Sequence, residues 1–186
     1  MAFGAGLEPE FFKNTAEVQK LIVKMDTQFD LVLIAEQMER SLVLLADLMC
    51  WPIEDVTFFK QNARPANAQR KTNLTEKDRE KLRALNSADL QIYDHFLQKF
   101  QQRVKHFGRI KMDERLRMLK TRNKQLKEEC VARVVVDEDG LGEVNTYELK
   151  EGASSKCRMM AMSESEFTEV LRTRKYVELD LFPLLN

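Results

Sequence analysis

Four polar side chains lie just after two short apolar runs. Polar groups at the ends of such runs are well placed to contact a substrate. Glu36 directly follows the run Leu31–Ala35, and a carboxylate there can accept a proton from a substrate hydroxyl. The same carboxylate can instead satisfy the free N–H groups or the dipole at the start of the next helix. Lys60, Asn62 and Arg64 follow the next run, where they can contact an anion or sugar hydroxyls, or simply face solvent. The sequence thus predicts a candidate substrate site, with Glu36 as the candidate for catalysis.

Other patterns that carry chemistry are weak in this chain. The 3 cysteines and 2 histidines lack the spacing of zinc ligands, so we predict no metal site. Asp137–Glu148 resembles a calcium loop, but Leu141 stands where an oxygen ligand belongs, which favours an acidic hairpin tip. His95 and His106 border an aromatic helix stripe, which favours structural or surface roles. No glycine begins the Gly-Lys-Ser/Thr helix start of a phosphate loop.

The apolar runs predict the elements that position the candidate residues. Leu31–Ala35 is short and rich in branched residues, which is typical of a strand buried on both faces. Leu42–Met49 is apolar nearly all round and predicts a buried helix that ends before Pro52. Val56–Phe59 predicts another short strand. This order indicates an α/β core with a parallel sheet, in which ligands bind outside the carboxyl ends of the strands.

Helical periodicity and capping residues predict the rest of the chain. The long helix over 88–107 carries an aromatic stripe that we expect in the core, and Gly108 ends it. The helix over 112–130 is expected to pack against it as an antiparallel hairpin. The remaining predictions are helices over 15–27, 76–85 and 164–176, the last two with capping boxes at Thr75 and Ser163, and a β-hairpin over 131–136 and 144–149.

Charge and hydropathy exclude some classes of protein. Lys plus Arg number 30 and Asp plus Glu number 30, so no basic field predicts nucleic-acid binding. No apolar run is long enough to span a bilayer and the N-terminus is no signal peptide, which favours the cytosol. Two features favour a secretory compartment instead. Asn73 begins a glycosylation sequon, and Cys130 and Cys157 flank the predicted hairpin, where a bridge is one possibility. We expect Cys50 to be a buried free thiol.

Three blocks of the chain resemble the galactose 3-O-sulfotransferase family. They are FDLVLIAE at 29–36, SLVLLADLMCW at 41–51 and EDVTFFKQNAR at 54–64. A looser likeness continues through LQIYDHF at 90–96 and around Cys157, so that it covers roughly 3–176. The chain departs from the family pattern at 37–40, where aromatic and acidic residues are typical, and at Ala46, where a lysine is typical. These departures bear on the preference for an acceptor.

The resemblance implies a fold and an activity. The fold would be the C-terminal part of a P-loop-like sulfotransferase fold, with a parallel-sheet remnant, a mainly helical cover and a small C-terminal hairpin. The reaction would transfer sulfate from 3'-phosphoadenylyl sulfate (PAPS) to the 3-hydroxyl of a terminal galactose on a glycolipid or glycoprotein glycan. The family works on the lumenal side of the Golgi membrane, held by an N-terminal anchor. That compartment permits both glycosylation at Asn73 and a Cys130–Cys157 disulfide.

Neither the anchor nor the donor's phosphate loop is found in this sequence. We therefore expect the C-terminal portion of a longer enzyme, inactive alone. Its segments would be 1–64, the α/β core remnant; 65–87, an exposed connection with the sequon; 88–130, a helical hairpin; and 131–186, a β-hairpin and the last helix. The alternative is a non-catalytic helical interaction module derived from the same fold.

Overall fold

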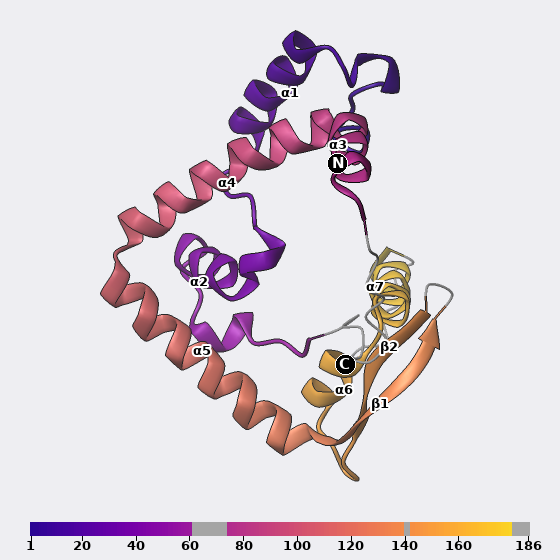
Figure 1. Cartoon of the computed structure of the whole chain (residues 1–186). Coiled ribbons are helices and arrows are strands. Elements are labelled where there is room, and N and C mark those ends of the chain that lie inside the picture. The colour runs from indigo at the N-terminus through magenta and orange to yellow at the C-terminus, as the bar shows by residue number, and fades with distance from the viewer. Residues whose placement is uncertain (61–73, 140–141, 180–186) are drawn as a thin grey trace. The chain divides into compact units, whose positions relative to one another are not determined.

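The computed structural model of the chain describes residues 1–60, 74–139 and 142–179 (Figure 1). These residues form two compact units, 1–56 with 74–119, and 57–60 with the described part of 120–179. Seven α-helices and one two-stranded sheet make up the described chain. They are α1 (Thr15–Gln28), α2 (Met38–Leu48), α3 (Glu76–Leu85), α4 (Ser87–Phe107), α5 (Arg109–Cys130), β1 (Val131–Asp139), β2 (Gly142–Leu149), α6 (Ser155–Ala161) and α7 (Glu164–Leu179), with 3-10 turns η1 (Pro9–Phe11), η2 (Ala35–Gln37) and η3 (Ile53–Val56).

In the first unit, α1 packs along the N-terminal half of α4 (Figure 1). The side chain of Asn14 accepts hydrogen bonds from the N–H groups of Ala16 and Glu17 and so caps α1. The apolar face of α1 recurs every three or four residues, and that spacing carries it onto α4. The buried residues of this cluster are Ala2, Leu7, Val18, Leu21, Ile22, Ala88, Ile92 and Phe96.

The second cluster of the first unit is centred on α2. Val43 and Leu44 of α2 pack with Phe100 of α4 and with Met112 and Leu119 of α5, all of them buried. The aromatic stripe of α4 is therefore core, as predicted. The predicted antiparallel hairpin of the two long helices is wrong, because their apolar faces pack against α2, which lies in the angle between them (Figure 1). The chain turns that corner at a glycine with a φ of 90°, which glycine adopts at little cost.

The parallel sheet expected near the N-terminus is absent from the described residues. The predicted strands Leu31–Ala35 and Val56–Phe59 pair with no other segment there, and the sheet is β1–β2 alone. The reason lies in where the backbone hydrogen bonds go. Side chains satisfy them: Ser41 bonds the backbone of Ile34, and Asn123 accepts from the N–H of Phe58 at 3.0 Å. The branched apolar residues favour an extended backbone. An extended segment becomes a β-strand only when it hydrogen-bonds to a neighbouring strand, and these two segments have none among the described residues.

The second unit contains the predicted hairpin. β1 and β2 run antiparallel, with Val131 opposite Leu149, an irregularity after Val131, and Arg133 opposite Glu148. The cross-strand pair Arg133–Glu148 is also an exposed ion pair. Apolar side chains from the hairpin, the end of α5, α6 and the segment after η3 form the core of this unit. The buried members are Phe59, Leu126, Cys130, Val131 and Cys157.

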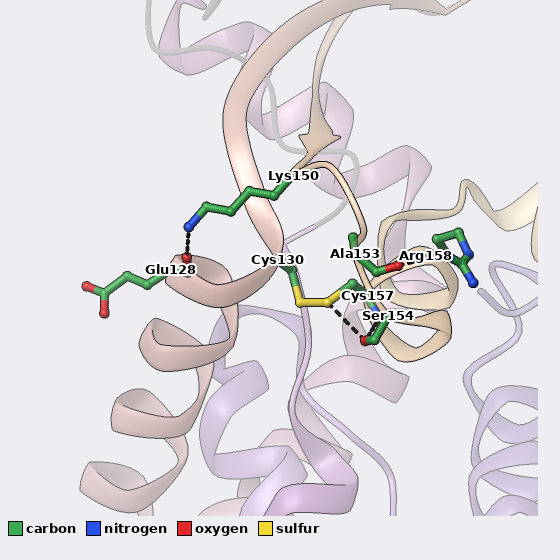
Figure 2. Close-up of a disulfide and its surroundings, with 7 residues drawn as sticks. All are labelled: Glu128, Cys130, Lys150, Ala153, Ser154, Cys157 and Arg158. Carbon is green, nitrogen blue, oxygen red and sulfur yellow. Dashed lines mark hydrogen bonds between the residues drawn. A yellow bond between two sulfur atoms is a disulfide. The ribbon is translucent and has the colours of Figure 1, made fainter.

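A disulfide joins the last residue of α5 to α6, which the sequence analysis did not predict as a helix (Figure 2). The bonded residues, Cys130 and Cys157, are both buried, and their pairing confirms the bridge that the resemblance implied. Ser154 caps the short helix by accepting from the N–H of Cys157 at 3.3 Å. Lys150 donates to the Glu128 carbonyl beside the bridge (Figure 2). The third cysteine, at 50, is free but exposed, so its predicted burial is wrong.

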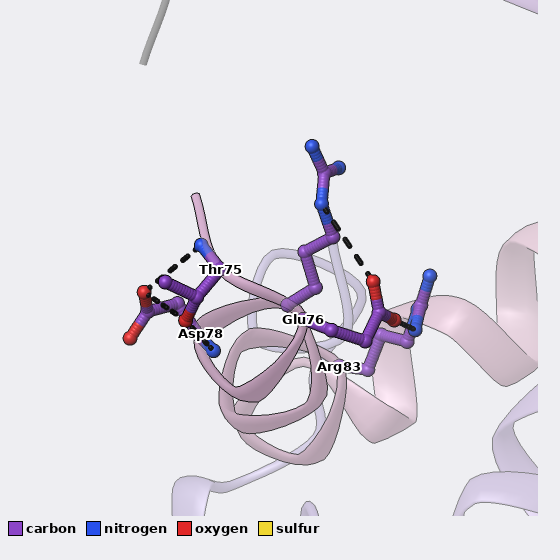
Figure 3. A network of polar contacts seen from close by, with 5 residues as sticks. Thr75, Glu76, Asp78 and Arg83 are labelled. Carbon is purple, nitrogen blue, oxygen red and sulfur yellow. Dashed lines mark hydrogen bonds and ion pairs between the residues drawn. The ribbon is translucent and has the colours of Figure 1, made fainter. Parts of the chain in front are cut away.

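Helix α3 buries none of its residues, so its ends and its charges must hold it (Figure 3). Thr75 and Asp78 form the predicted capping box: each backbone N–H donates to the other's side chain, at 3.1 and 3.2 Å. The hydrogen bonds from the hydroxyl and N–H of Thr75 hold the pKa of Asp78 below its usual value. Glu76 and Arg83 pair at 3.0 Å across two turns (Figure 3). The helix is thus a surface element.

Candidate functional site

Glu36, the predicted catalytic candidate, lies on the exposed η2 turn. Its carboxylate makes no hydrogen bond or ion pair with another described residue. The next helix, α2, begins at Met38 without a capping bond from its N-cap side chain, and Glu36 supplies none either. Glu36 therefore makes no hydrogen bond to the free N–H groups of α2, and its interaction with the dipole of that helix stays a prediction. The carboxylate is free to meet a ligand, and its catalytic role stays a prediction.

The turn that carries Glu36 is tied down at its base by a buried hydroxyl. Ser41 is fully buried, and its Oγ accepts from the N–H of Ile34 at 2.9 Å and donates to the carbonyl of Ile34 at 3.1 Å. The same carbonyl also accepts from the N–H of Gln37 at 2.9 Å. The Ser41 hydroxyl makes the two backbone hydrogen bonds that a neighbouring strand would otherwise make to Ile34. It therefore fixes the backbone two residues before Glu36.

Lys60 ends a segment of the second unit that is held through its backbone. The ring of Phe59 packs against that of Tyr147, with ring centroids 5.1 Å apart, and the Tyr147 hydroxyl donates to the Lys60 carbonyl at 2.9 Å. Burial raises the pKa of the Tyr147 hydroxyl, and the hydrogen bond to that carbonyl offsets the rise only in part. The side chain of Lys60 is exposed. Its backbone is therefore positioned while its ammonium group stays available.

The remaining predicted site residues are not placed. Asn62, Arg64 and the sequon residue Asn73 lie outside the described residues. Glu36 belongs to the first compact unit and Lys60 to the second. The substrate site therefore stays a prediction.

A polar cluster that the sequence analysis missed lies between α1 and α4. Asp26, near the end of α1, contacts His95 Nε2 through Oδ2 at 2.9 Å and accepts from Lys99 Nζ through Oδ1 at 2.6 Å. Their side chains are 27 to 39% exposed. Burial works to raise the pKa of Asp26, but the bonds from Lys99 and His95 and their charge outweigh it, so the pKa is lowered.

The spacing of residues in α4 indicates part of this polar cluster. His95 and Lys99 are four residues apart, which places them on one face of the helix. Their partner lies 69 and 73 residues away in sequence, and nothing in the local pattern identifies it. Chemically, a carboxylate bonded to an imidazole orients the ring and decides which nitrogen carries the proton. The cluster can therefore position donors along this face of α4.

Two other kinds of site are not seen in the part of the chain that the structure describes. Over residues 1–60, 74–139 and 142–179, no 3 side chains of His, Cys, Asp or Glu are grouped to hold a metal ion. No helix in those ranges is long and apolar enough to cross a bilayer. Among the described residues, His106 bonds its own helix, through Nδ1 and the Gln102 carbonyl at 2.9 Å.

Comparison with known proteins agrees with the resemblance seen in the sequence. A family profile described as Galactose-3-O-sulfotransferase matches residues 1–144. Galactosylceramide sulfotransferase of Bos taurus is 35% identical over 129 residues, which are 69% of this chain and 30% of that protein. Galactosylceramide sulfotransferase of Homo sapiens is 30% identical over 183 residues, 89% of this chain and 43% of that protein.

A second type of relative matches over a similar length. Galactose-3-O-sulfotransferase 4 of Bos taurus is 29% identical over 196 residues, 92% of this chain and 41% of that protein. The chain thus spans less than half the length of these curated relatives. No solved structure matches it. With the family profile covering 144 of its 186 residues, the chain belongs to the galactose-3-O-sulfotransferase family.

Proposed function

We propose that this chain is part of an enzyme that transfers sulfate from PAPS to the 3-hydroxyl of a terminal galactose. The acceptor is a glycolipid or glycoprotein glycan, and the compartment is the Golgi lumen. The family match over residues 1–144 carries the proposal. The buried Cys130–Cys157 disulfide supports the compartment, because disulfides persist in oxidising compartments of the secretory route.

The reaction sets three physical requirements. The donor's phosphates need a cradle of cations and N–H groups, the sulfur and the attacking oxygen must be held in line, and the hydroxyl must lose its proton. No glycine of this chain is followed by lysine, so we assign the donor's phosphates to no residue here. We propose instead that the chain contributes to the acceptor side. Glu36 is the candidate base, with Lys60, Asn62 and Arg64 as candidate contacts.

The test is a sulfate-transfer assay on two preparations. One is the 186-residue chain. The other is bovine galactosylceramide sulfotransferase in which this chain replaces the matched region. Each is given radiolabelled PAPS with galactosylceramide or with a galactose-terminated glycan. We expect transfer to the 3-hydroxyl by the chimera alone. A secreted, disulfide-bonded chimera that transfers no sulfate to galactose refutes the proposal.

Two variants of the chimera examine the role of Glu36. Glu36→Gln removes the base but keeps the size of the side chain, so we expect kcat to fall at least about a hundredfold with little change in KM. Glu10→Gln changes another exposed glutamate of the same unit and serves as the matched control. Equal kcat in the two variants contradicts the assignment of Glu36 as base.

Glycosylation is tested separately, since the compartment predicts it. In the secretory route we expect Asn73 to carry a glycan, because its sequon lies in a polar stretch of the sequence. Treatment with peptide N-glycosidase should lower the mass of the secreted protein and leave that of Asn73→Gln unchanged. If the wild-type protein has the same mass before and after this treatment, the prediction of a glycan on Asn73 is contradicted.

A further inference from the structure

One edge of helix α2 is apolar and yet is not fully buried. Val43 and Leu44 of this helix are buried in the core of the first unit. The polar residues Arg40 and Asp47 lie on an exposed edge of the helix, as polar side chains usually do. On the opposite edge, apolar residues recur at intervals of four, three and four, which places them in one row. This apolar edge of α2 consists of Met38, Leu42, Leu45 and Met49.

The apolar edge is most exposed at its two ends. Met38 is 38% exposed and Met49 is 47% exposed, whereas Leu42 and Leu45 between them are half-buried. Trp51, which is 44% exposed, extends the apolar surface beyond Met49. The first unit therefore covers the sides of this row and leaves the row itself open to a second surface.

The turn at the end of the apolar edge is held by its backbone, so its side chains do not belong to a frayed end. The N–H of Trp51 donates to the Ala46 carbonyl at 2.8 Å. Cys50 has a φ of 54°, the left-handed conformation in which helices commonly end. The chain then returns to the core at Ile53, which is buried. An apolar surface of fixed shape loses little conformational entropy when another surface packs on it.

The charges beside the apolar edge favour a protein surface as its partner. None of the four residues of the edge is charged, and Asp47 next to Met49 is paired with Lys111 of α5 at 2.9 Å. A charged ligand would therefore gain no ion pair along the edge. An exposed apolar surface bordered by polar groups is typical of a contact with another protein surface, since burial of apolar area drives the association.

The pattern of α2 and the length of the relatives together indicate what covers the edge. A helix that is apolar nearly all round belongs in the core of a large protein, with neighbours on more than one side. In the relatives described above, the matched region is 30 to 43% of the protein, so more than half of each polypeptide lies outside it. A part of that size can supply a second layer over α2.

We propose that the apolar edge of α2 is the surface on which the remaining part of the enzyme packs, namely the part that the relatives have outside the matched region. The inference deepens the proposed function and rests on it, because it takes this chain as a portion of a longer enzyme. Glu36 lies on the turn just before α2. This packing would therefore place the candidate base at the junction with the part to which the donor's phosphates are left.

The exposed thiol of Cys50 reports whether the edge is covered. The chain has 3 cysteines, and the other two form the disulfide, so N-ethylmaleimide modifies Cys50 in the oxidised chain. Mass spectrometry of the peptide that contains Cys50 gives the rate of reaction in the 186-residue chain and in the chimera described above. We expect the rate to be at least about a hundredfold lower in the chimera, because the reagent must wait there for a local opening.

A variant at the far end of the edge separates packing from a local effect on Cys50. Met38→Gln keeps the size of the side chain and lies about three helical turns from Met49. We expect Cys50 of the chimera to react about fivefold faster in this variant, and Cys50 of the isolated chain to react at the wild-type rate. Met118→Gln is the matched control, because Met118 belongs to the same unit and is also 38% exposed.

The proposal fails if Cys50 reacts equally fast in the chimera and in the isolated chain, or if Met38→Gln has no more effect than the control. It also fails if Cys50 is already protected in the isolated chain. Protection that grows with protein concentration assigns the edge to a second copy, protection by phosphatidylcholine vesicles assigns it to a membrane, and protection without either assigns it to this chain's own residues.

The same chimera distinguishes this inference from the proposed function. If the chimera transfers sulfate while Cys50 stays as reactive as in the isolated chain, the surface assignment fails and the proposed function stands. If Cys50 is protected in a chimera that transfers no sulfate to galactose, the proposed function fails and the surface assignment stands.

Discussion

Replacing Ser41 by alanine tests whether the hydrogen bonds from its side chain to the backbone of Ile34 stabilise the fold in the way that pairing with a neighbouring strand would. In the native chain this buried hydroxyl bonds both backbone groups of Ile34. The carbonyl of Ile34 keeps a second partner, the N–H of Gln37, in the variant. The N–H of Ile34 keeps none that the structure describes, and Ile34 is only 4% exposed. The variant therefore leaves one buried donor without a partner.

The size of the effect follows from these bonds. A buried donor left unsatisfied costs about 2 kcal/mol, and the second lost hydrogen bond adds about 1 kcal/mol. Alanine returns about 0.5 kcal/mol, because it favours the helix more than serine does. We expect Ser41→Ala to lower the free energy of unfolding by about 2.5 kcal/mol.

Urea unfolding followed by tryptophan fluorescence measures this loss. The chain has 1 tryptophan, Trp51, which lies in the same compact unit as Ser41 and so reports on it. Arg40→Ala is the matched control, because it alters an exposed residue of the same helix. A loss below about 0.5 kcal/mol, within the usual range for surface changes, refutes the reasoning. So does a loss no larger than that of the control.

Three further predictions concern the disulfide, the polar cluster and the exposed helix α3. Replacing Cys130 and Cys157 by serine should lower the stability of the second unit by about 3.5 kcal/mol, which is the chain-entropy value for a separation of 27 residues. Thermal unfolding measures this loss, and a loss under about 1 kcal/mol contradicts the prediction. The lowered pKa of Asp26 predicts stability that is fully present above the unfolded value of about 3.9 and lost as the pH falls through the folded value. The stability gap between wild type and Asp26→Asn, from urea unfolding at several pH values, should then be constant near neutrality and shrink below about pH 4; a gap that widens there contradicts it. Thr75→Ala removes the cap of α3, so amide exchange at 76–79 should quicken about fivefold while that of α4 is unchanged, and equal rates in the first turn contradict it.

The helices could be predicted because their signals are local. The capping boxes at Thr75 and Ser163, the aromatic stripe of α4 and the glycine at its end each act within a few residues. The hairpin was predicted for the same reason. Helix α6 was missed because it has only 7 residues, too few to show a period, and only Ser154 marks its start.

The strands and the polar cluster could not be predicted because their partners are distant in sequence. Nothing in Leu31–Ala35 says that Ser41 will bond its backbone instead of another strand. Nothing near Phe58 points to Asn123, 65 residues later. His95 was likewise assigned a structural role without its partner on α1. The predicted division at 64, 87 and 130 stays a prediction.

The Cys130–Cys157 bridge also decides how the chain responds to a cut. Every peptide bond between these residues lies within a covalent ring that includes the hairpin tip. A protease that cleaves there opens the ring but releases no fragment, because the sulfur link still joins α5 to α6. The nicked protein would migrate as an intact chain until a reductant is added. A single cut between the two cysteines therefore leaves α6 and α7 attached to the rest of the protein.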